Sequence, residues 1–265
     1  MGRSRRGIGL SWWMVLALVL WVVTRFVGRT TSGSDESAEG SDTARYRPTV
    51  QEGLGASVAI LLDNSGSMED DPEDAAGAPK FRIARDVLGR VLEQTEAFVA
   101  RQAGFPVNVG LYVFSSGVER ALPIGPYDRA KLADALAKLP APDGATAIGD
   151  AMNVAVEDLY GAGTIRKYIL VVTDGENTEG RDPAAVAREI ARRSDGAVRL
   201  LMVAFDVSAE NFGFVQEVRG TLLEARNAVA LQASLDTLYR GRILAEAVDA
   251  GETLAPADTI RTKRQ

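Results

Sequence analysis

The sequence predicts an α/β domain with a doubly wound, mostly parallel sheet flanked by helices, preceded by one N-terminal transmembrane helix. Two observations favour this fold class. Short continuous apolar runs alternate with segments of helical periodicity, which is the pattern of a parallel sheet with helices on both faces. A stretch of 18 residues near the N-terminus, from Gly7 to Thr24, contains no charged residue.

The uncharged stretch has the length and the flanks of a membrane anchor. As a helix it would be about 27 Å long, close to the ~30 Å of the bilayer hydrocarbon core. Arg3, Arg5 and Arg6 precede it, and this positive bias favours an N-terminus in the cytoplasm. A cleaved signal peptide is disfavoured because no A-x-A-like site ends the run, whereas a twin-arginine export signal stays open as an alternative. We expect residues 1–29 to be an uncleaved, single-pass anchor in the inner membrane, with the domain on the extracytoplasmic side.

Residues 30–55 have the composition of a flexible linker. Ser, Gly, Asp and Glu dominate from Thr30 to Thr49, and large apolar residues are absent, so the segment cannot bury enough surface to order itself. The body is expected over residues 56–250, and about 195 residues suffice for one well-buried domain. The charged segment 251–265 is predicted to be a disordered tail.

The first half of the body alternates strand and helix patterns. Ser57–Leu62 is a continuous apolar run, as a strand buried on both faces requires. Phe81–Ala100 has apolar residues at helical spacing. Val109–Phe114 predicts a second strand and Ala121–Ile124 an edge strand. A helix face marked by leucines then ends at Pro140.

The second half repeats the alternation. Ile148–Leu159 has helical periodicity, Tyr168–Val172 is a third buried strand, and Asp182–Pro183 opens a helix with an N-cap residue followed by Pro. Leu200–Phe205 is a fourth buried strand. The predicted elements that close the body are a helix, a short strand and a last helix, over Phe212–Val218, Thr221–Ala225 and Ala228–Val248.

The composition excludes several classes of site. The chain has no His and no Cys, which rules out disulfides, Cys/His zinc sites and catalytic triads that need His. Any metal must be held by oxygen, so Mg²⁺, Ca²⁺ and Mn²⁺ are the candidates. The net charge is −6, but residues 1–30 carry five Arg and no acid, so the remainder is at −11. An acidic body is a poor binder of nucleic acid.

Polar residues follow two of the predicted buried strands. The first strand runs into Asp63-Asn64-Ser65-Gly66-Ser67, and Tyr168–Val172 runs into Thr173-Asp174-Gly175. Between them in sequence, Gly144-Ala145-Thr146 opens a helix. Because the carboxyl ends of parallel strands share one edge of the sheet, these carboxylates and hydroxyls are expected to converge there. Gly66 and Gly144 fit tight turns in which a side chain would crowd the site.

Asp63-x-Ser65-x-Ser67, then Thr146, then Thr173-Asp174-Gly175, in this order, resembles the von Willebrand factor type A (VWA) family, and in particular bacterial membrane-anchored VWA proteins. The resemblance covers roughly residues 56–248 and implies a Rossmann-like VWA fold. It also implies a metal-ion-dependent adhesion site (MIDAS), in which Ser65, Ser67 and Thr146 would bind Mg²⁺ through their hydroxyls. Asp63 and Asp174 would act mainly through water or as outer acceptors.

The chemistry of such a ligand set agrees with a binding role. Mg²⁺ prefers near-octahedral oxygen ligation and keeps several waters, with Mn²⁺ or Ca²⁺ as alternatives. Neutral hydroxyls leave most of the ion's positive charge uncompensated, so a carboxylate from a partner protein can complete its shell. We therefore expect a membrane-tethered, metal-dependent protein-binding module and not an enzyme.

Other functions are weighed against this one. A Mg²⁺-dependent hydrolytic enzyme and an adhesin-type matrix-binding protein are the alternatives. Gly144 and Gly149 have the glycine spacing of a phosphate-binding loop, but Asp150 stands where Lys is required, so no nucleotide is expected.

The family resemblance implies that the protein works beside MoxR-type AAA+ ATPases or in envelope assemblies. The acidic segment Glu69–Lys80 is either a solvated loop or an extra cation site that shapes partner choice.

Overall fold

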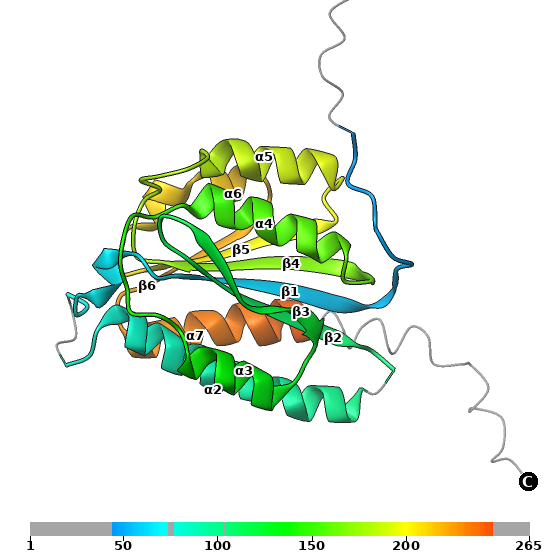
Figure 1. Cartoon of the computed structure of the whole chain (residues 1–265), viewed down its shortest axis with the longest axis horizontal. Coiled ribbons are helices and arrows are strands. Elements are labelled where there is room, and N and C mark those ends of the chain that lie inside the picture. The colour runs from blue at the N-terminus through cyan, green and yellow to red at the C-terminus, as the bar shows by residue number, and fades with distance from the viewer. Residues whose placement is uncertain (1–43, 74–76, 103, 246–265) are drawn as a thin grey trace, which may run out of the picture. The chain divides into compact units, whose positions relative to one another are not determined.

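In the part of the chain that the structure describes, six strands form one sheet in the order β3-β2-β1-β4-β5-β6 (Figure 1). The computed structural model describes residues 44–73, 77–102 and 104–245. Neighbouring strands run parallel except β2 and β3, which are antiparallel. The bounds are β1 Gly53–Asp63, β2 Val107–Phe114, β3 Val118–Pro126, β4 Thr164–Thr173, β5 Val198–Phe205 and β6 Thr221–Ala225. The predicted doubly wound, mostly parallel sheet is confirmed, with an antiparallel edge strand.

The strand order reverses between β1 and β4. The chain passes from β1 to β2 and β3 on one side, then returns to β4 and continues to β5 and β6 on the other. The last residue of β1, Asp63, pairs with Phe114 of β2, and Leu62 pairs with Val172 of β4. The carboxyl ends of β1 and β4 therefore lie side by side at the switch point, where open α/β sheets bind their ligands.

Helices cover both faces of the sheet (Figure 1). One face carries α4, α5 and α6, and the other carries α2, α3 and α7. Along β1, Val58 and Ile60 pack toward the α2 side, and Ala59 and Leu61 pack toward the α4 side. Both faces of the central strands are thus removed from water, which explains why their sequences are continuously apolar. The bounds are α2 Lys80–Arg101, α3 Arg129–Ala137, α4 Ile148–Tyr160, α5 Pro183–Arg193, α6 Phe214–Glu217 and α7 Ala228–Leu238.

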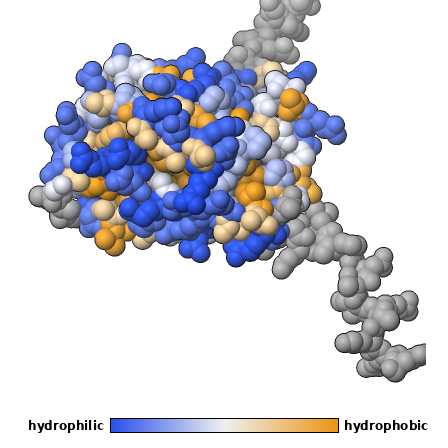
Figure 2. All heavy atoms as spheres, turned by 60° about the horizontal axis from the view of Figure 1, so that its bottom comes forward, coloured by the Kyte–Doolittle hydropathy of each residue, from blue (hydrophilic) through white to orange (hydrophobic). Residues whose placement is uncertain are grey.

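Short irregular turns complete the domain. They are the 3₁₀ turns η1 Gly66–Glu69 and η2 Ala209–Phe212 and the π-helical turn η3 Tyr239–Leu244. The turned view in Figure 2 shows hydrophilic side chains over most of the molecule's visible face, with small scattered hydrophobic areas. Asp182 caps α5 as predicted, since its carboxylate accepts from two amides of the first turn.

Two predicted helices differ in the structure. The helix predicted over 212–218 is divided into η2 and α6 at Gly213. The last helix is regular only to Leu238 and continues as the π-helical turn, which brings Tyr239, Ile243 and Leu244 into the core. Apolar spacing alone does not distinguish a π-turn from an α-helix, because both place such residues on one face. Residues 246–248 of that prediction lie outside the described residues.

The chain before β1 also packs on the domain. The Tyr46 ring stacks on Tyr160 at 5.0 Å, and the Arg193 guanidinium lies 3.9 Å from the Tyr46 ring centre. The amide of Gly53 donates to the carbonyl of Gly163. The expected boundary at residue 56 thus falls inside β1, because the apolar run marks only the buried part of that strand.

The N-terminal predictions lie largely outside the described residues. The predicted anchor over 1–29 and the predicted linker up to residue 43 are not among the described residues. The predicted tail over 251–265 also lies outside them. Within the ranges that the structure describes, no helix is both long and apolar enough to cross a membrane.

Candidate metal centre

The five residues predicted as a metal site meet at the carboxyl ends of β1 and β4, at the left of the sheet in Figure 1. Asp63 ends β1, and the two serines lie in the following turn. Asp174 directly follows β4, and Thr146 lies two residues before α4. The residues are Asp63, Ser65, Ser67, Thr146 and Asp174.

Asp63 is completely buried and both of its carboxylate oxygens accept hydrogen bonds. Oδ1 accepts from the amide of Ser65 at 2.8 Å, and Oδ2 accepts from the hydroxyl of Thr173 at 2.5 Å. Burial, together with the charge of Asp174, raises the pKa of Asp63 to about 6, even though these hydrogen bonds lower it. Asp63 therefore fixes the turn and adds negative charge while its own oxygens are already engaged.

The serine hydroxyls and Asp174 form a connected set. Ser67 Oγ donates to Asp174 Oδ1 at 2.9 Å and lies 3.2 Å from Ser65 Oγ. Ser65 and Asp174 are buried, whereas Ser67 is exposed. The set thus runs from the interior to the surface, and Ser67 marks its open side.

The backbone of Thr146 is hydrogen-bonded to Thr178, and its hydroxyl lies beside Gly175, near the serine hydroxyls. Its amide donates to Thr178 Oγ1 at 2.9 Å, and its carbonyl accepts from the amide of Thr178 at 2.9 Å. A methyl group placed on Gly175 would lie 3.9 Å from both Ser67 Oγ and Thr146 Oγ1. The two hydroxyls therefore border one small space beside Gly175.

The loops that carry these residues are fastened to one another. The amide of Gly66 donates to the carbonyl of Gly144 at 3.1 Å. Gly144 has φ +82°, and a Cβ there would approach Ser116 Oγ to 2.9 Å, so the predicted need for glycine is confirmed. At Gly66 a Cβ would make only an ordinary contact at 3.6 Å, so the prediction of crowding at Gly66 is wrong. The turn there is an ordinary 3₁₀ turn and leaves room for a side chain.

The structure brings two further charged residues to the centre. Lys80 Nζ lies 2.8 Å from Asp174 Oδ2 and 3.6 Å from Oδ2 of Asp206, the residue after β5. Lys80 was interpreted only as the end of an acidic segment, and Asp206 was not singled out. The sequence around Lys80, which follows five acidic residues, does not predict that the lysine contacts aspartates at the ends of two distant strands.

The donor set fits a hard cation. It offers hydroxyl and carboxylate oxygens, which Mg²⁺, Mn²⁺ and Ca²⁺ prefer. Asp174 Oδ2 is buried and, among the described residues, has no hydrogen-bond partner beyond its ion pair with Lys80. No group of three or more His, Cys, Asp or Glu capable of holding a metal occurs in the described part of the chain. Hydroxyls would therefore have to supply most of the direct ligands.

The acidic segment folds back on the domain where it is described. The amide of Glu73 donates to Asp206 Oδ2 at 3.2 Å, and the amide of Gly77 donates to Asp71 Oδ2 at 2.9 Å. In the described ranges the segment supplies no cluster of acids that could form an extra cation site. The described part of the segment thus contacts Asp206, the residue after β5.

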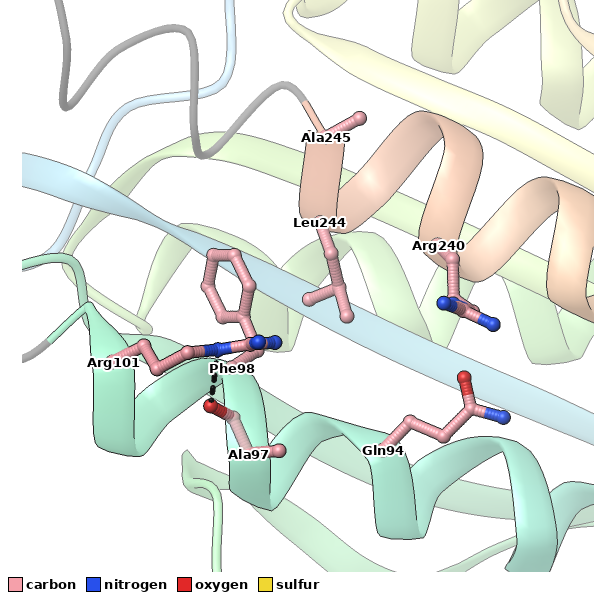
Figure 3. A pocket seen from close by; sticks show the side chains of 7 residues that line it. All are labelled: Gln94, Ala97, Phe98, Arg101, Arg240, Leu244 and Ala245. Atoms are coloured by element: carbon pink, nitrogen blue, oxygen red, sulfur yellow. Dashed lines mark hydrogen bonds between the residues drawn. The ribbon is translucent and has the colours of Figure 1, made fainter.

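A separate hollow of about 420 Å³ lies between α2 and η3. Figure 3 shows Leu244 pointing from η3 toward α2, with Arg101 and Arg240 at the two ends of the hollow. Phe98, which also lines it, follows Lys80 by about five helical turns, or roughly 27 Å. The hollow is therefore remote from the candidate centre and contributes nothing to it.

Comparison with family models identifies a von Willebrand factor type A domain over residues 57–222. Comparison with curated proteins gives no match.

Several solved structures share the fold. The PilB minor pilin from Streptococcus sanguinis is 15% identical, with a TM-score of 0.61 over 78% of this chain and 64% of that chain, so this chain spans less than two thirds of the pilin. An aerotolerance-related membrane protein from Bacteroides fragilis, a variant with multiple mutations to serines, is 21% identical (TM-score 0.55, 72% of this chain and 100% of that chain). Proximal thread matrix protein 1 from the mussel byssus, with a zinc-occupied MIDAS motif, is 13% identical (TM-score 0.56, 75% of this chain and 47% of that chain).

Proposed function

The chain belongs to the von Willebrand factor type A family, and from this premise we propose that it is a metal-ion-dependent protein-interaction module. The observation that carries the proposal is the convergence of three hydroxyls and two carboxylates at the switch point of the sheet. The zinc-occupied MIDAS motif of the mussel protein supports it from a relative of the same fold.

In this proposal Ser65, Ser67 and Thr146 hold Mg²⁺ through their hydroxyls. Asp63 and Asp174 act mainly through water or as outer acceptors, in keeping with the engaged oxygens of Asp63. When bound, the ion supplies a positive charge with an open position for an anionic oxygen. Because neutral hydroxyls compensate little of that charge, the ligand expected there is a carboxylate of a partner protein.

Binding fits these residues better than hydrolysis does. A metal-assisted hydrolase needs a general base within reach of the attacking water. Both oxygens of Asp63 already accept hydrogen bonds. Asp174 accepts from Ser67 and pairs with Lys80. These hydrogen bonds and the ion pair hold both carboxylates in fixed positions at the edge of the sheet, which suits a binding site.

The same proposal covers the arrangement of the whole chain. Residues 1–29 anchor it in the cell membrane, the segment up to residue 43 connects the anchor to the domain on the extracytoplasmic side, and residues 251–265 form a tail. The uncharged run of 18 residues supports the anchor, as does the description of the Bacteroides fragilis relative as a membrane protein. The partner belongs to a MoxR-type AAA+ or envelope assembly, and neither nucleic acid nor nucleotide is bound.

The first test is metal affinity, measured by titration calorimetry of the full-length protein in mild detergent with Mg²⁺, Mn²⁺ and Ca²⁺. Thr146→Ala removes one proposed ligand and should weaken Mg²⁺ binding by about tenfold or more, as loss of a ligand or its support does at metal sites. Thr237→Ala is the matched control, because this threonine is exposed on α7 and its hydroxyl donates to the carbonyl of Ala233 in the same helix. Equal affinities in the two variants would contradict the site.

The second test separates metal binding from carboxylate capture. Ser65→Asp adds a negative ligand, so Mg²⁺ should bind as well as before or more tightly. An incoming acidic partner then meets a like charge, which weakens its binding. Proteins retained by the wild type in Mg²⁺ and released by EDTA should be lost from Ser65→Asp at saturating Mg²⁺. Equal retention with metal bound in both would refute carboxylate capture.

A further inference from the structure

Lys80 is a buried cation at the edge of the candidate metal centre. It is the first residue of α2 and only 8% exposed. Its Nζ lies 2.8 Å from Asp174 Oδ2, and Asp206 Oδ2 is at 3.6 Å. Because Asp174 is one of the five proposed site residues, the lysine contacts the centre directly.

The helix does not account for the position of this charge. A cation at a helix N-terminus opposes the helix dipole, at a cost of about 0.3–1 kcal/mol, and α2 has no acidic residue in its first turn. Burial of a lysine is a further cost. Burial lowers the pKa of Lys80, but the hydrogen bond and charge of Asp174 and the charges of Asp206 and Asp70 outweigh it, so the net shift is upward. The two carboxylates thus keep the ammonium charged and in place.

Lys80 also changes the net charge of the group of aspartates around it. Asp63, Asp174 and Asp206 gather three carboxylates at neighbouring strand ends, all with little exposure. With Lys80 the sum of these charges is −2. Without Lys80 the sum is −3, and the attraction for a divalent cation rises.

We propose that Lys80 is a tethered counter-ion of the metal centre: it stabilises the metal-free domain by pairing with Asp174 and weakens the affinity of the centre for its divalent cation. The inference deepens the proposed function and depends on it. The lysine makes the metal site exchangeable. It also leaves more of the bound ion's charge for an acidic partner, since it balances one carboxylate that the ion would otherwise have to compensate.

The test is titration of the full-length protein with MgCl₂ alone, comparing wild type with Lys80→Met. Methionine keeps the length and apolar stem of lysine but removes its charge. We expect Kd for Mg²⁺ to fall by about tenfold, the scale on which one adjacent charge changes the binding of a proton to a carboxylate. Lys138→Met is the control, because Lys138 pairs with Asp134 on the exposed side of α3. Its Kd for Mg²⁺ should equal that of the wild type.

The sign of the change separates this role from a merely structural one. If Lys80 only held the loop in shape, its loss would disorder the site and weaken Mg²⁺ binding. The tethered counter-ion predicts tighter binding together with a lower melting temperature in EDTA, and a larger rise in melting temperature on addition of Mg²⁺ than in the wild type. Circular dichroism measures both temperatures.

A second variant serves if Lys80→Met folds poorly. Lys80→Met with Asp206→Asn removes one charge of each sign and restores the sum of −2. Asn suits this position because Asp206 has φ +58°, where Asn is well tolerated. Its Kd for Mg²⁺ should lie within about threefold of the wild-type value, since the net charge that acts on the cation is unchanged.

The outcomes distinguish the two proposals. Wild-type Mg²⁺ binding with an equal or weaker affinity in Lys80→Met overturns the role of Lys80 and leaves the proposed function intact. For the double variant, a Kd tenfold away from the wild-type value likewise overturns the charge argument. Absence of Mg²⁺ binding in wild type and variants alike overturns the proposed function and, with it, the counter-ion.

Discussion

Replacement of Asp63 by Asn should stabilise the metal-free domain while it removes metal binding. Asp63 is fully buried, and its pKa is raised from 3.8 to about 6. Each pH unit is worth about 1.4 kcal/mol, so the charged form costs the metal-free fold about 3 kcal/mol above pH 7.

The local hydrogen bonds allow the amide to fit. Asn Oδ1 can accept from the amide of Ser65 as Asp63 does. The amide nitrogen of Asn can donate to Thr173 Oγ1, and the Thr173 hydroxyl can then donate to the carbonyl oxygen of Gly175, which lies 3.0 Å from Oγ1. We subtract about 1 kcal/mol for the weaker neutral hydrogen bond and expect a gain of about 2 kcal/mol at pH 7.5.

The pH dependence gives the sign of the effect. For a carboxyl whose folded pKa is raised, the stabilisation is fully present below the unfolded pKa of 3.8 and is lost as the pH rises through about 6. Wild type should therefore lose about 2.4 kcal/mol relative to Asp63→Asn between pH 4 and 7.5, with most of the change between pH 4 and 6.5.

The assay is urea unfolding of residues 44–265 in EDTA at pH 4.5 and 7.5, followed by circular dichroism. Asp134→Asn is the control, since Asp134 is exposed on α3 and should change stability by less than about 0.5 kcal/mol. Addition of Mg²⁺ should stabilise the wild type but not Asp63→Asn. Equal or lower stability of Asp63→Asn at pH 7.5 in EDTA would refute the reasoning.

Two further predictions concern the fold. Gly149→Ala should destabilise the domain by about 2 kcal/mol or more despite the better helix propensity of Ala, because the new Cβ would lie 2.2 Å from the carbonyl oxygen of Arg181. Gly89→Ala places its Cβ 3.8 Å from Leu136 and should stabilise the domain by about 0.5–1 kcal/mol. Urea unfolding measures both changes. Equal effects of the two changes would contradict this. Tyr46→Ala should cost about 1–2 kcal/mol in the same measurement, because the stacked ring pair and the Arg193 contact are lost; unchanged stability would show that the segment before β1 does not contribute.

Local patterns predicted most of the fold. The runs Tyr168–Val172 and Leu200–Phe205 lie inside β4 and β5, because a strand covered on both faces must be apolar at every position. Asp182 and Pro183 predicted the start of α5, since capping depends only on neighbouring residues. The antiparallel direction of β3 was not predicted, because an edge strand of either direction has the same composition.

The candidate site was predicted in part. Asp63 and Asp174 were predicted to follow buried strands and to meet at one edge of the sheet, because parallel strands share the edge at which they end. The structure places the two strands, β1 and β4, next to each other. The contact of Lys80 with Asp174 and Asp206 was missed. In sequence Lys80 ends a run of acids, and such runs are normally solvated.

The sequence by itself determined the alternation of strands and helices and the oxygen donors at the strand ends, since apolar spacing, caps and residue chemistry are local properties. Only the tertiary structure decided the electrostatics. Two residues of the same type acquire different surroundings: Asp63 is buried and accepts hydrogen bonds from Thr173 and Ser65, and Asp174 is paired with Lys80. The physical reason is that desolvation and charge pairing depend on which distant segments exclude water from a side chain, and packing alone brings those segments together.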